Sequence, residues 1–385
     1  MAKEGPVQNP FHYKNPIYSG YFADPFVWKH QGRYYAVGTG QEGTVADIRD
    51  GDRAIPVLFS DNLVEWHSAG GALKVKAEDR ARPFWAPEVA FDGRHFYLYY
   101  STATVGLLHQ IRVARSESPT GPYEDMAYLI GCSDECPFAI DAHPFQDDDG
   151  QWYLFYARDF LDSHGGVRVG TALVVDRLVN MTRLAGEEKV VLRSRYNWQL
   201  FKSQREMYGQ IWDWHTLEGP CVRKRNGLYY CFYSGGCYEN ETYGVDYGVA
   251  ESVMGPYTEA GNEFGPRVLK TVVGEVVGPG HNSIVEGPDG EWVGLVEPGD
   301  EVGYTEGQNS AGVVNNLVNG KTSLTAETNG AVVFWDGKWG PDDQFAVLLS
   351  GSGDAQLWVT GPGAARPGLG GLGLLNASRT KADKH

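Results

Sequence analysis

Positively charged residues are scarce in this chain of 385 residues. Its 33 Lys and Arg are outnumbered by 49 Asp and Glu, which gives a formal net charge of −16 at pH 7. Affinity for nucleic acids rests largely on clustered Lys and Arg, and anionic membrane surfaces attract the same residues. Neither a nucleic acid nor a membrane is therefore expected as a partner, and a neutral ligand is favoured.

Long apolar runs and cysteines are also rare. No stretch reaches the roughly 18 apolar residues that suggest a membrane span, and MAKEGPVQNP at the start lacks the basic and apolar regions of a signal peptide.

The five cysteines cannot all pair, and no two of them have the CxxC spacing of a zinc site. We expect mostly reduced thiols, with a Cys132–Cys136 or Cys231–Cys237 bridge as the alternative. A cytoplasmic location is expected rather than a secreted one, although a removed signal peptide would leave the same sequence.

Runs at helical spacing are few, whereas glycine and aromatic residues are abundant. The chain has 50 Gly, 20 Pro, 16 Phe, 22 Tyr and 11 Trp. This composition predicts short strands joined by many turns, and hence an all-β fold. Trp and Tyr also suit sugar ligands, because the C–H faces of sugars pack on aromatic rings.

One motif recurs five times, as a polar residue and a glycine followed by aromatic and aliphatic residues. This pattern predicts a hairpin turn that enters a buried strand. The turn glycines are spaced 61, 57, 77 and 63 residues apart. They are Gly32, Gly93, Gly150, Gly227 and Gly290. Each interval fits one four-stranded sheet with its loops, so the chain is predicted to form a five-bladed β-propeller; a β-sandwich with similar hairpins is the poorer alternative.

Residues with chemical capacity recur at one offset before these glycines. Asp24 lies eight residues before its glycine, and Asp141, Glu218 and His281 each lie nine before theirs. If the repeats superpose, these residues begin the innermost strands of successive blades and converge on the axis. Gathered carboxylates raise one another's pKa, which is costly unless it serves chemistry.

Each acid also has an ordinary structural explanation. Asp24 could cap a turn before Pro25, Asp141 could pair with His143, and Glu218 could be a rim carboxylate. Glycoside hydrolysis commonly uses two carboxyl groups, and a third can tune the acid. A calcium site would also accept three acids, but the nearby Trp and Phe residues favour a sugar.

The motifs that carry these residues resemble glycoside hydrolase family 43 from about Asn15 to Asp300. They are NPIYSGYFADPFV, RPFWAPEV, AIDAHPFQDDDG, TLEGPCVRKRNGLYYCFYSGG and GPGHNSIVEGPDGEW. The resemblance implies a five-bladed propeller of inverting enzymes. It assigns Asp24 as the general base that activates water, Glu218 as the general acid, and Asp141 as the residue that tunes and positions the acid.

The resemblance also implies residues around the acids. Phe84 and Trp85 are similar to the aromatic wall of the family's sugar pocket, with core packing as the alternative. His281 resembles a histidine that faces a metal ion, usually Ca²⁺ held largely by water; because calcium prefers six to eight oxygens, a core histidine is the other interpretation. No organic cofactor is implied.

A stretch rich in aromatic residues precedes Glu218, in the longest interval between repeats. Its residues Trp212, Trp214 and His215 are predicted either to form a pocket wall or leaving-group subsite, or to anchor a loop. After Asp300 the resemblance fades, and no arginine directed at the sugar can be identified. We expect residues 1–300 to form the catalytic propeller. Residues 301–385 are expected to be an extension that completes the last blade or begins an appended sugar-binding sandwich, and that is partly flexible at its Gly-rich end.

Three functions follow as hypotheses. The first is an exo-acting hydrolase that releases terminal α-L-arabinofuranosyl or β-D-xylosyl residues from hemicellulose-derived oligosaccharides, which are neutral and contain pentoses. The second is an endo-1,5-α-L-arabinanase, which needs an open cleft. The third, a non-catalytic sugar-binding propeller, is disfavoured because all three acid positions are filled.

Overall fold

The computed structural model describes residues 18, 21–40, 53–79, 82–103, 108–131, 133, 136–261, 263–271, 277–287 and 292–297, together with five short strands nearer the C-terminus. Strands dominate this part of the chain. Its helical segments are three short 3₁₀ turns, η2 (Ala77–Asp79), η3 (His164–Gly166) and η4 (Asn197–Gln199). No helix among these residues is long and apolar enough to cross a membrane.

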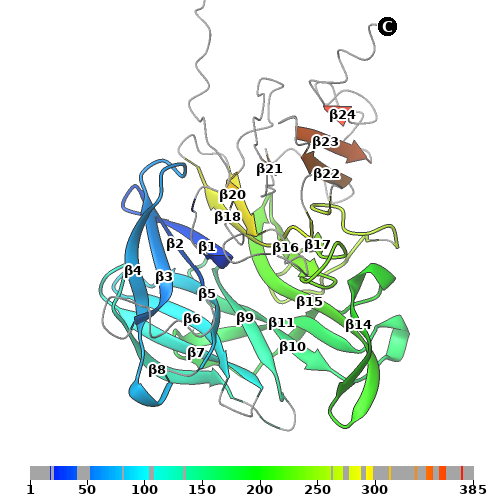
Figure 1. Cartoon of the computed structure of the whole chain (residues 1–385), viewed down its shortest axis with the longest axis horizontal. Helices are drawn as coiled ribbons and strands as arrows, with labels where there is room; N and C mark the ends of the chain where they lie inside the picture. Colours follow the sequence, from blue (N-terminus) through cyan, green and yellow to red (C-terminus); the bar gives the residue numbers. More distant parts are fainter. Residues whose placement is uncertain are drawn as a thin grey trace, which may run out of the picture.

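The strands follow one another in antiparallel groups, and each group is a blade (Figure 1). Blade 1 contains β1 (Ala23–His30), β2 (Arg33–Thr39), β3 (Arg53–Ser60) and β4 (His67–Lys74). Blade 2 contains β5 (Phe84–Phe91), β6 (Phe96–Ala103), β7 (His109–Ser116) and β8 (Tyr123–Ile130). Blade 3 contains β9 (Ala139–Gln146), β10 (Trp152–Phe160), β11 (Gly170–Asn180) and β13 (Lys189–Leu192), with the short β12 (Arg183–Leu184) at its end.

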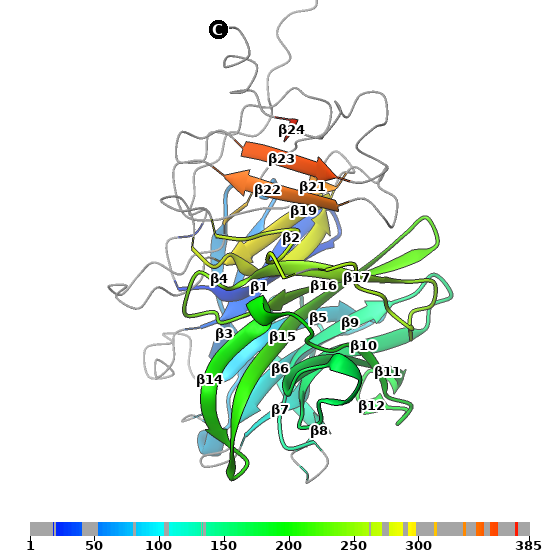
Figure 2. The same cartoon turned by 90° about the vertical axis from the view of Figure 1, so that its right-hand side faces the viewer.

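Blade 4 contains β15 (Gln210–Arg225), β16 (Leu228–Gly235) and β17 (Gly244–Ala250). The first half of β15 pairs with β14 (Leu200–Met207), and Figure 2 shows this hairpin reaching away from the blade. Blade 5 contains β18 (Gly280–Glu286) and β19 (Trp292–Glu297), and β19 also pairs with β20 (Gly312–Val313) and β21 (Phe334–Trp335). A separate sheet joins β22 (Gln344–Leu349), β23 (Ala355–Thr360) and β24 (Leu374–Leu375).

The innermost strands of the five blades form a closed ring. Strand β1 contacts β5, β5 contacts β9, β9 contacts β15, β15 contacts β18, and β18 returns to β1. The N-terminal strand therefore lies beside the last blade, which closes the circle without an exposed inner edge. The five-bladed propeller predicted from the repeats is confirmed, whereas the division at residue 300 stays a prediction.

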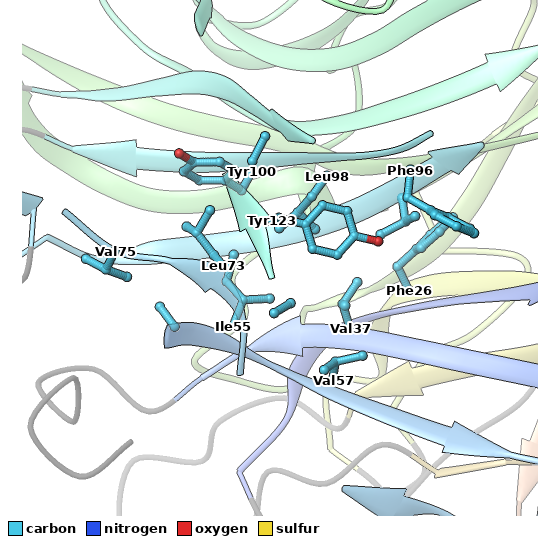
Figure 3. Close-up of a cluster of buried hydrophobic side chains, with 14 of the residues drawn as sticks. Phe26, Val37, Ile55, Val57, Leu73, Val75, Phe96, Leu98, Tyr100 and Tyr123 are labelled. Carbon is cyan, nitrogen blue, oxygen red and sulfur yellow. The ribbon is translucent and has the colours of Figure 1, made fainter. Parts of the chain in front are cut away.

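Apolar side chains fill the spaces between blades, since alternate residues of a strand face opposite neighbours. In one cluster, Val37 and Ile55 of blade 1 pack with Leu98 and Tyr123 of blade 2 (Figure 3). The other face of blade 2 packs against blade 3 in the same way, and blade 3 packs against blade 4. Each blade thus relies on its neighbours for its core, and the axis is left for polar residues.

The repeated glycines lie where the sequence predicts turns. Gln31-Gly32 and Asn226-Gly227 form two-residue hairpins, and all four residues have positive φ, as type I′ turns require. Gly93 and Gly150 also have positive φ but lie in longer turns, and Gly290 falls outside the described residues.

Four of the cysteines fall in the described part of the chain, and all four are free thiols. They are Cys136, Cys221, Cys231 and Cys237. The Cys231–Cys237 bridge is therefore not formed, which agrees with the expected reduced state. Cys132 lies outside the described residues.

Candidate active site

Every innermost strand contains a β-bulge near its start. In β1 the pair Ala23↔Thr39 is followed by Phe26↔Val37, so two residues of β1 oppose one of β2. The same register shift occurs in β5, β9, β15 and β18. The first bulge residue has positive φ in all five strands; these residues are Asp24, Ala86, Asp141, Gly219 and His281. The bulges bring five equivalent positions to the same level of the axis.

Glu218 does not lie at the level of the first bulge residues. The sequence offset, which placed Glu218 nine residues before its turn glycine in the same position as Asp141, is therefore wrong for blade 4. Gly219 holds the position equivalent to Asp24 and Asp141, and Glu218 lies one residue before it. The offset fails because the hairpin of blade 4 closes in two residues, Asn226 and Gly227, whereas that of blade 3 closes in five, between Gln146 and Trp152. Trp85 of blade 2 occupies the position equivalent to Glu218.

Hydroxyl groups connect these bulges from blade to blade. The Ala86 N–H donates to Thr39 Oγ1 at 2.8 Å, the Asp141 N–H to Ser101 Oγ at 3.0 Å, and the His281 N–H to Ser234 Oγ at 2.7 Å. Each hydroxyl comes from the second strand of the preceding blade. In its own blade, each hydroxyl residue pairs with the residue just before the bulge. The pairs are Ala23↔Thr39, Trp85↔Ser101 and Glu218↔Ser234.

Blade 3 lacks the hydroxyl, because Ala157 occupies the equivalent position and pairs with Ile140. The carboxylate of Asp141 serves as the acceptor instead: the Gly219 N–H donates to Asp141 Oδ2 at 2.9 Å. Since Gly219 directly follows Glu218, this bond fixes Asp141 beside the backbone of the predicted acid.

Asp24 is held by residues of other strands through both carboxylate oxygens. Thr39 donates its hydroxyl to Oδ2, and Oδ1 lies 2.9 Å from Nδ1 of His281. Burial alone would raise the pKa of Asp24, but the charge of His281 and hydrogen bonds from His281, Thr39 and the Ala86 N–H outweigh it and lower the pKa. Its side chain remains 20% exposed, so water can reach an ionised carboxylate.

Asp141 is buried, and its carboxyl is not paired with His143. Nδ1 of His143 lies 2.7 Å from Glu88 Oε2, and Nε2 accepts the Val222 N–H at 3.0 Å. Burial raises the pKa of Asp141 to about 6; the Gly219 N–H and the charge of His281 oppose this rise, and Asp24 and Glu88 add to it.

Glu218 is half-buried and accepts a hydrogen bond from the Tyr243 hydroxyl at 2.8 Å. The Tyr243 ring is buried against Gly280, where an added Cβ would lie 2.0 Å from the ring. Burial and the charge of Asp141 raise the pKa of Glu218 to about 8, against the lowering effect of Tyr243. Glu218 therefore keeps its proton at neutral pH, whereas Asp24 is ionised.

His281 lies at the bulge of blade 5, within the same group. Its Nδ1 contacts Asp24, and its ring packs against Gly219, where an added Cβ would lie 3.2 Å away. No three His, Cys, Asp or Glu residues of the described chain are grouped so as to hold a metal ion. This donor set does not fit a calcium ion held by side chains. Calcium near His281 stays a prediction, which EDTA dialysis with calcium add-back would test.

Aromatic residues flank one side of the group. Trp85 stacks on His109 at 3.7 Å between ring centroids, and His109 meets the edge of Phe138 at 5.8 Å. Phe84 instead packs against Tyr100 and the core between blades 1 and 2, which is the alternative raised for it above. The structure therefore joins Trp85, and not Phe84, to an aromatic stack.

The predicted aromatic residues before Glu218 lie on the β14–β15 hairpin. Trp214 is only 1% exposed and contacts Tyr208, whose hydroxyl donates to Asp159 of blade 3 at 2.7 Å. His215 is also buried, and its backbone pairs with Gly170 of β11. These contacts favour the anchoring role for Trp214 and His215. Trp212 is half-buried, and its indole N–H donates to the Met207 carbonyl within the hairpin.

Several residues of this region were missed from the sequence, among them Thr39, Tyr243 and His109. A signal existed for Thr39, because Ser or Thr follows the turn glycine by seven or eight residues in three repeats and Ala157 replaces it in another. Tyr243 and His109 begin no repeat and carry no comparable signal.

The family described as "Glycosyl hydrolases family 43" matches this chain from residue 13 to residue 309. The matched range contains all five bulges and the three acids.

The chain is also similar to individual carbohydrate-cleaving enzymes, at low sequence identity. The chain is similar to a beta-D-galactofuranosidase, xynD, of Aspergillus niger, with 29% identity over 292 residues covering 72% of this chain and 73% of the relative. It is also similar to xylosidase/arabinosidase 43A of Humicola insolens, with 27% identity over 301 residues covering 69% and 84%. A solved structure of a thermostable family-43 glycoside hydrolase is 27% identical, with a TM-score of 0.64, and the similarity covers 93% of this chain and 99% of that one.

Proposed function

The chain belongs to glycosyl hydrolases family 43, and on that basis we propose that it is an inverting enzyme that releases terminal α-L-arabinofuranosyl or β-D-xylosyl residues from hemicellulose-derived oligosaccharides. Asp24 is the general base, Glu218 the general acid, and Asp141 the residue that positions and tunes the acid. The substrate is a neutral oligosaccharide that contains pentoses.

In the proposed reaction, Asp24 takes a proton from a water molecule as the water oxygen bonds to the anomeric carbon. The bond from that carbon to the leaving oxygen breaks with its electron pair, and Glu218 gives its proton to this oxygen. Attack from the face opposite the leaving group inverts the anomeric configuration. Solvent then returns a proton to Glu218 and removes one from Asp24.

One observation carries this proposal: two carboxyl groups at the axis have pKa values displaced in opposite directions. The pKa of Asp24 is lowered and that of Glu218 is raised to about 8. The base must be ionised and the acid protonated at the same pH. The surroundings of Asp24 favour its ionised form, and those of Glu218 favour its protonated form. Asp141 bonds to the backbone N–H beside Glu218, which supports its positioning role.

The surroundings of the acids support removal of a terminal sugar. The stack of Trp85, His109 and Phe138 offers an apolar wall, and the β14–β15 hairpin, anchored by Tyr208, rises beside blade 3. Similarity to a xylosidase/arabinosidase supports a pentose. Similarity to a galactofuranosidase favours β-D-galactofuranosyl as a second candidate, because its ring hydroxyls are arranged as in α-L-arabinofuranose, with a longer exocyclic chain.

Hydrolysis of a defined panel tests this function. It contains the p-nitrophenyl glycosides of α-L-arabinofuranose, β-D-xylose and β-D-galactofuranose, together with linear 1,5-α-L-arabinan. We expect release of single pentoses, and proton NMR during the first turnovers should show the inverted anomer. Cleavage of internal arabinan bonds alone would establish the endo-arabinanase instead. If the wild-type protein hydrolyses none of these substrates, a sugar-binding propeller is indicated.

The pH profile should follow the two carboxyls. Above about pH 8 Glu218 loses its proton, so kcat/KM should fall there, and it should also fall at low pH where Asp24 becomes protonated.

Tyr243→Phe removes a donor that stabilises ionised Glu218, so the alkaline limb of the pH profile should move up by about one pH unit or less. The limb is measured as kcat/KM against pH.

The matched control is Tyr233→Phe, because the buried hydroxyl of Tyr233 on β16 bonds to Glu259 and not to Glu218. It should leave the alkaline limb in place. An unmoved limb in Tyr243→Phe, or an equal shift in the control, would show that Tyr243 does not set the proton affinity of Glu218.

A further inference from the structure

Thr39 lies at the end of β2 and contacts two blades at once. It is 5% exposed. Its Oγ1 accepts the Ala86 N–H of blade 2 at 2.8 Å and also contacts Oδ2 of Asp24 on the neighbouring strand β1. Among the described residues, the equivalent Ser101 and Ser234 accept their bulge N–H groups without bonding to a carboxylate.

The direction of both bonds at Thr39 is fixed by chemistry. A backbone N–H can only donate, so Oγ1 is the acceptor toward Ala86. An ionised carboxylate can only accept, so the single hydroxyl proton of Thr39 points to Asp24. If the hydroxyl rotated away, Asp24 would lose this bond, and a bond to a charged group is worth more than a neutral one.

The other oxygen of Asp24 is held from the opposite side by His281 of blade 5 at 2.9 Å. Contacts from blades 1 and 5 therefore hold the two carboxylate oxygens, and blade 2 contributes the Ala86 N–H, which bonds to Thr39 and also lowers the pKa of Asp24. Charged or titratable neighbours that influence Asp24 are His281 of β18, Asp141 of β9 and Glu218 of β15.

We infer that Thr39 is a positioning residue for Asp24: its hydroxyl, pinned by the Ala86 N–H, orients the carboxylate toward the water that attacks the sugar. The inference rests on the proposed function, since it gives Asp24 the role of base. It assigns to Thr39 a role beyond the blade-linking role of Ser101 and Ser234.

The test compares three variants on the substrate that the wild-type enzyme hydrolyses best. Thr39→Val keeps the shape but removes donor and acceptor, and Thr39→Ser keeps both. Ser101→Ala removes the acceptor of the Asp141 N–H and serves as the control for thermal stability and for the geometry of Asp24. We expect kcat of Thr39→Val to fall about 10- to 100-fold with KM changed less than about threefold, because the lost bond orients a group that acts in the transition state. Thr39→Ser should restore kcat to within about threefold of wild type.

Thermal melting and crystal structures separate positioning from folding. Ser101→Ala should lose thermal stability because it leaves one bulge N–H without its acceptor, and Thr39→Val should lose at least as much because it also removes the bond to Asp24. Only Thr39→Val should show the Asp24 carboxylate turned from its contact with His281. This structural result is independent of activity, so it decides the inference even if the panel shows that the protein hydrolyses none of the proposed substrates.

An unchanged Asp24 carboxylate in Thr39→Val would overturn the inference. So would a kcat loss in Thr39→Ser that equals the loss in Thr39→Val, because the loss would then not depend on the hydroxyl of residue 39. Failure of the proposed function has a different signature: wild-type protein would release no terminal pentose, whatever the geometry of Asp24.

Discussion

Asp24→Asn is expected to reduce kcat/KM by about 10³- to 10⁴-fold on every substrate, whatever its leaving group. The base acts on water, so a better leaving group cannot replace it. Asparagine keeps the size of the side chain and an oxygen for Thr39 or His281, so the melting temperature should change little. Steady-state kinetics on an aryl glycoside and on an unsubstituted oligosaccharide measure both losses.

Sodium azide provides the control for this role. Azide is already an anion and needs no base, so in Asp24→Ala, which leaves room for it, azide should restore release of p-nitrophenol and give a glycosyl azide of inverted configuration. A retained configuration, or a loss that is small on the oligosaccharide, would assign the base to another residue.

Glu218→Gln should show the opposite pattern, with a loss that depends on the leaving group. A sugar alcohol leaves poorly without a proton, so kcat/KM on oligosaccharides should fall about 10²- to 10⁴-fold. p-Nitrophenolate needs little protonation, and its release should fall about tenfold or less. A series of aryl glycosides gives the dependence as a slope of rate against leaving-group pKa, which should steepen in the variant.

The alkaline limb supplies a second measure in the same variant. Glutamine does not titrate, so the fall in rate above about pH 8 should disappear. Equal losses of Glu218→Gln and Asp24→Asn across all leaving groups would reject the division into acid and base, even if both residues are essential.

The propeller could be predicted because turns and strand patterns are local. A glycine at a two-residue turn needs positive φ, so Gly32 and Gly227 mark their hairpins in the sequence itself. The level of Glu218 could not be counted from those turns, because hairpins of different length displace the count by one residue. In blade 4 the residue at the level of Asp24 is Gly219, which has no functional group to attract attention.

Contacts between distant segments explain what else the sequence did not reveal. Tyr243 reaches Glu218 from the loop between β16 and β17, and His109 meets Trp85 across two strands of blade 2. The burial of Trp214 depends on Tyr208 and on blade 3, so sequence alone left its role open. The sugar, the location, calcium and the role of residues 301–385 stay predictions.

Ala157 in blade 3 has a consequence for how the scaffold is coupled to the acids. Because it carries no hydroxyl, the seam between blades 3 and 4 is closed at the axis by Asp141, whose charge also raises the pKa of Glu218. A shift of blade 3 relative to blade 4 would change the separation of these two carboxyls. A substitution or ligand that shifts this seam would therefore alter the proton affinity of the site through the scaffold, without touching the sugar.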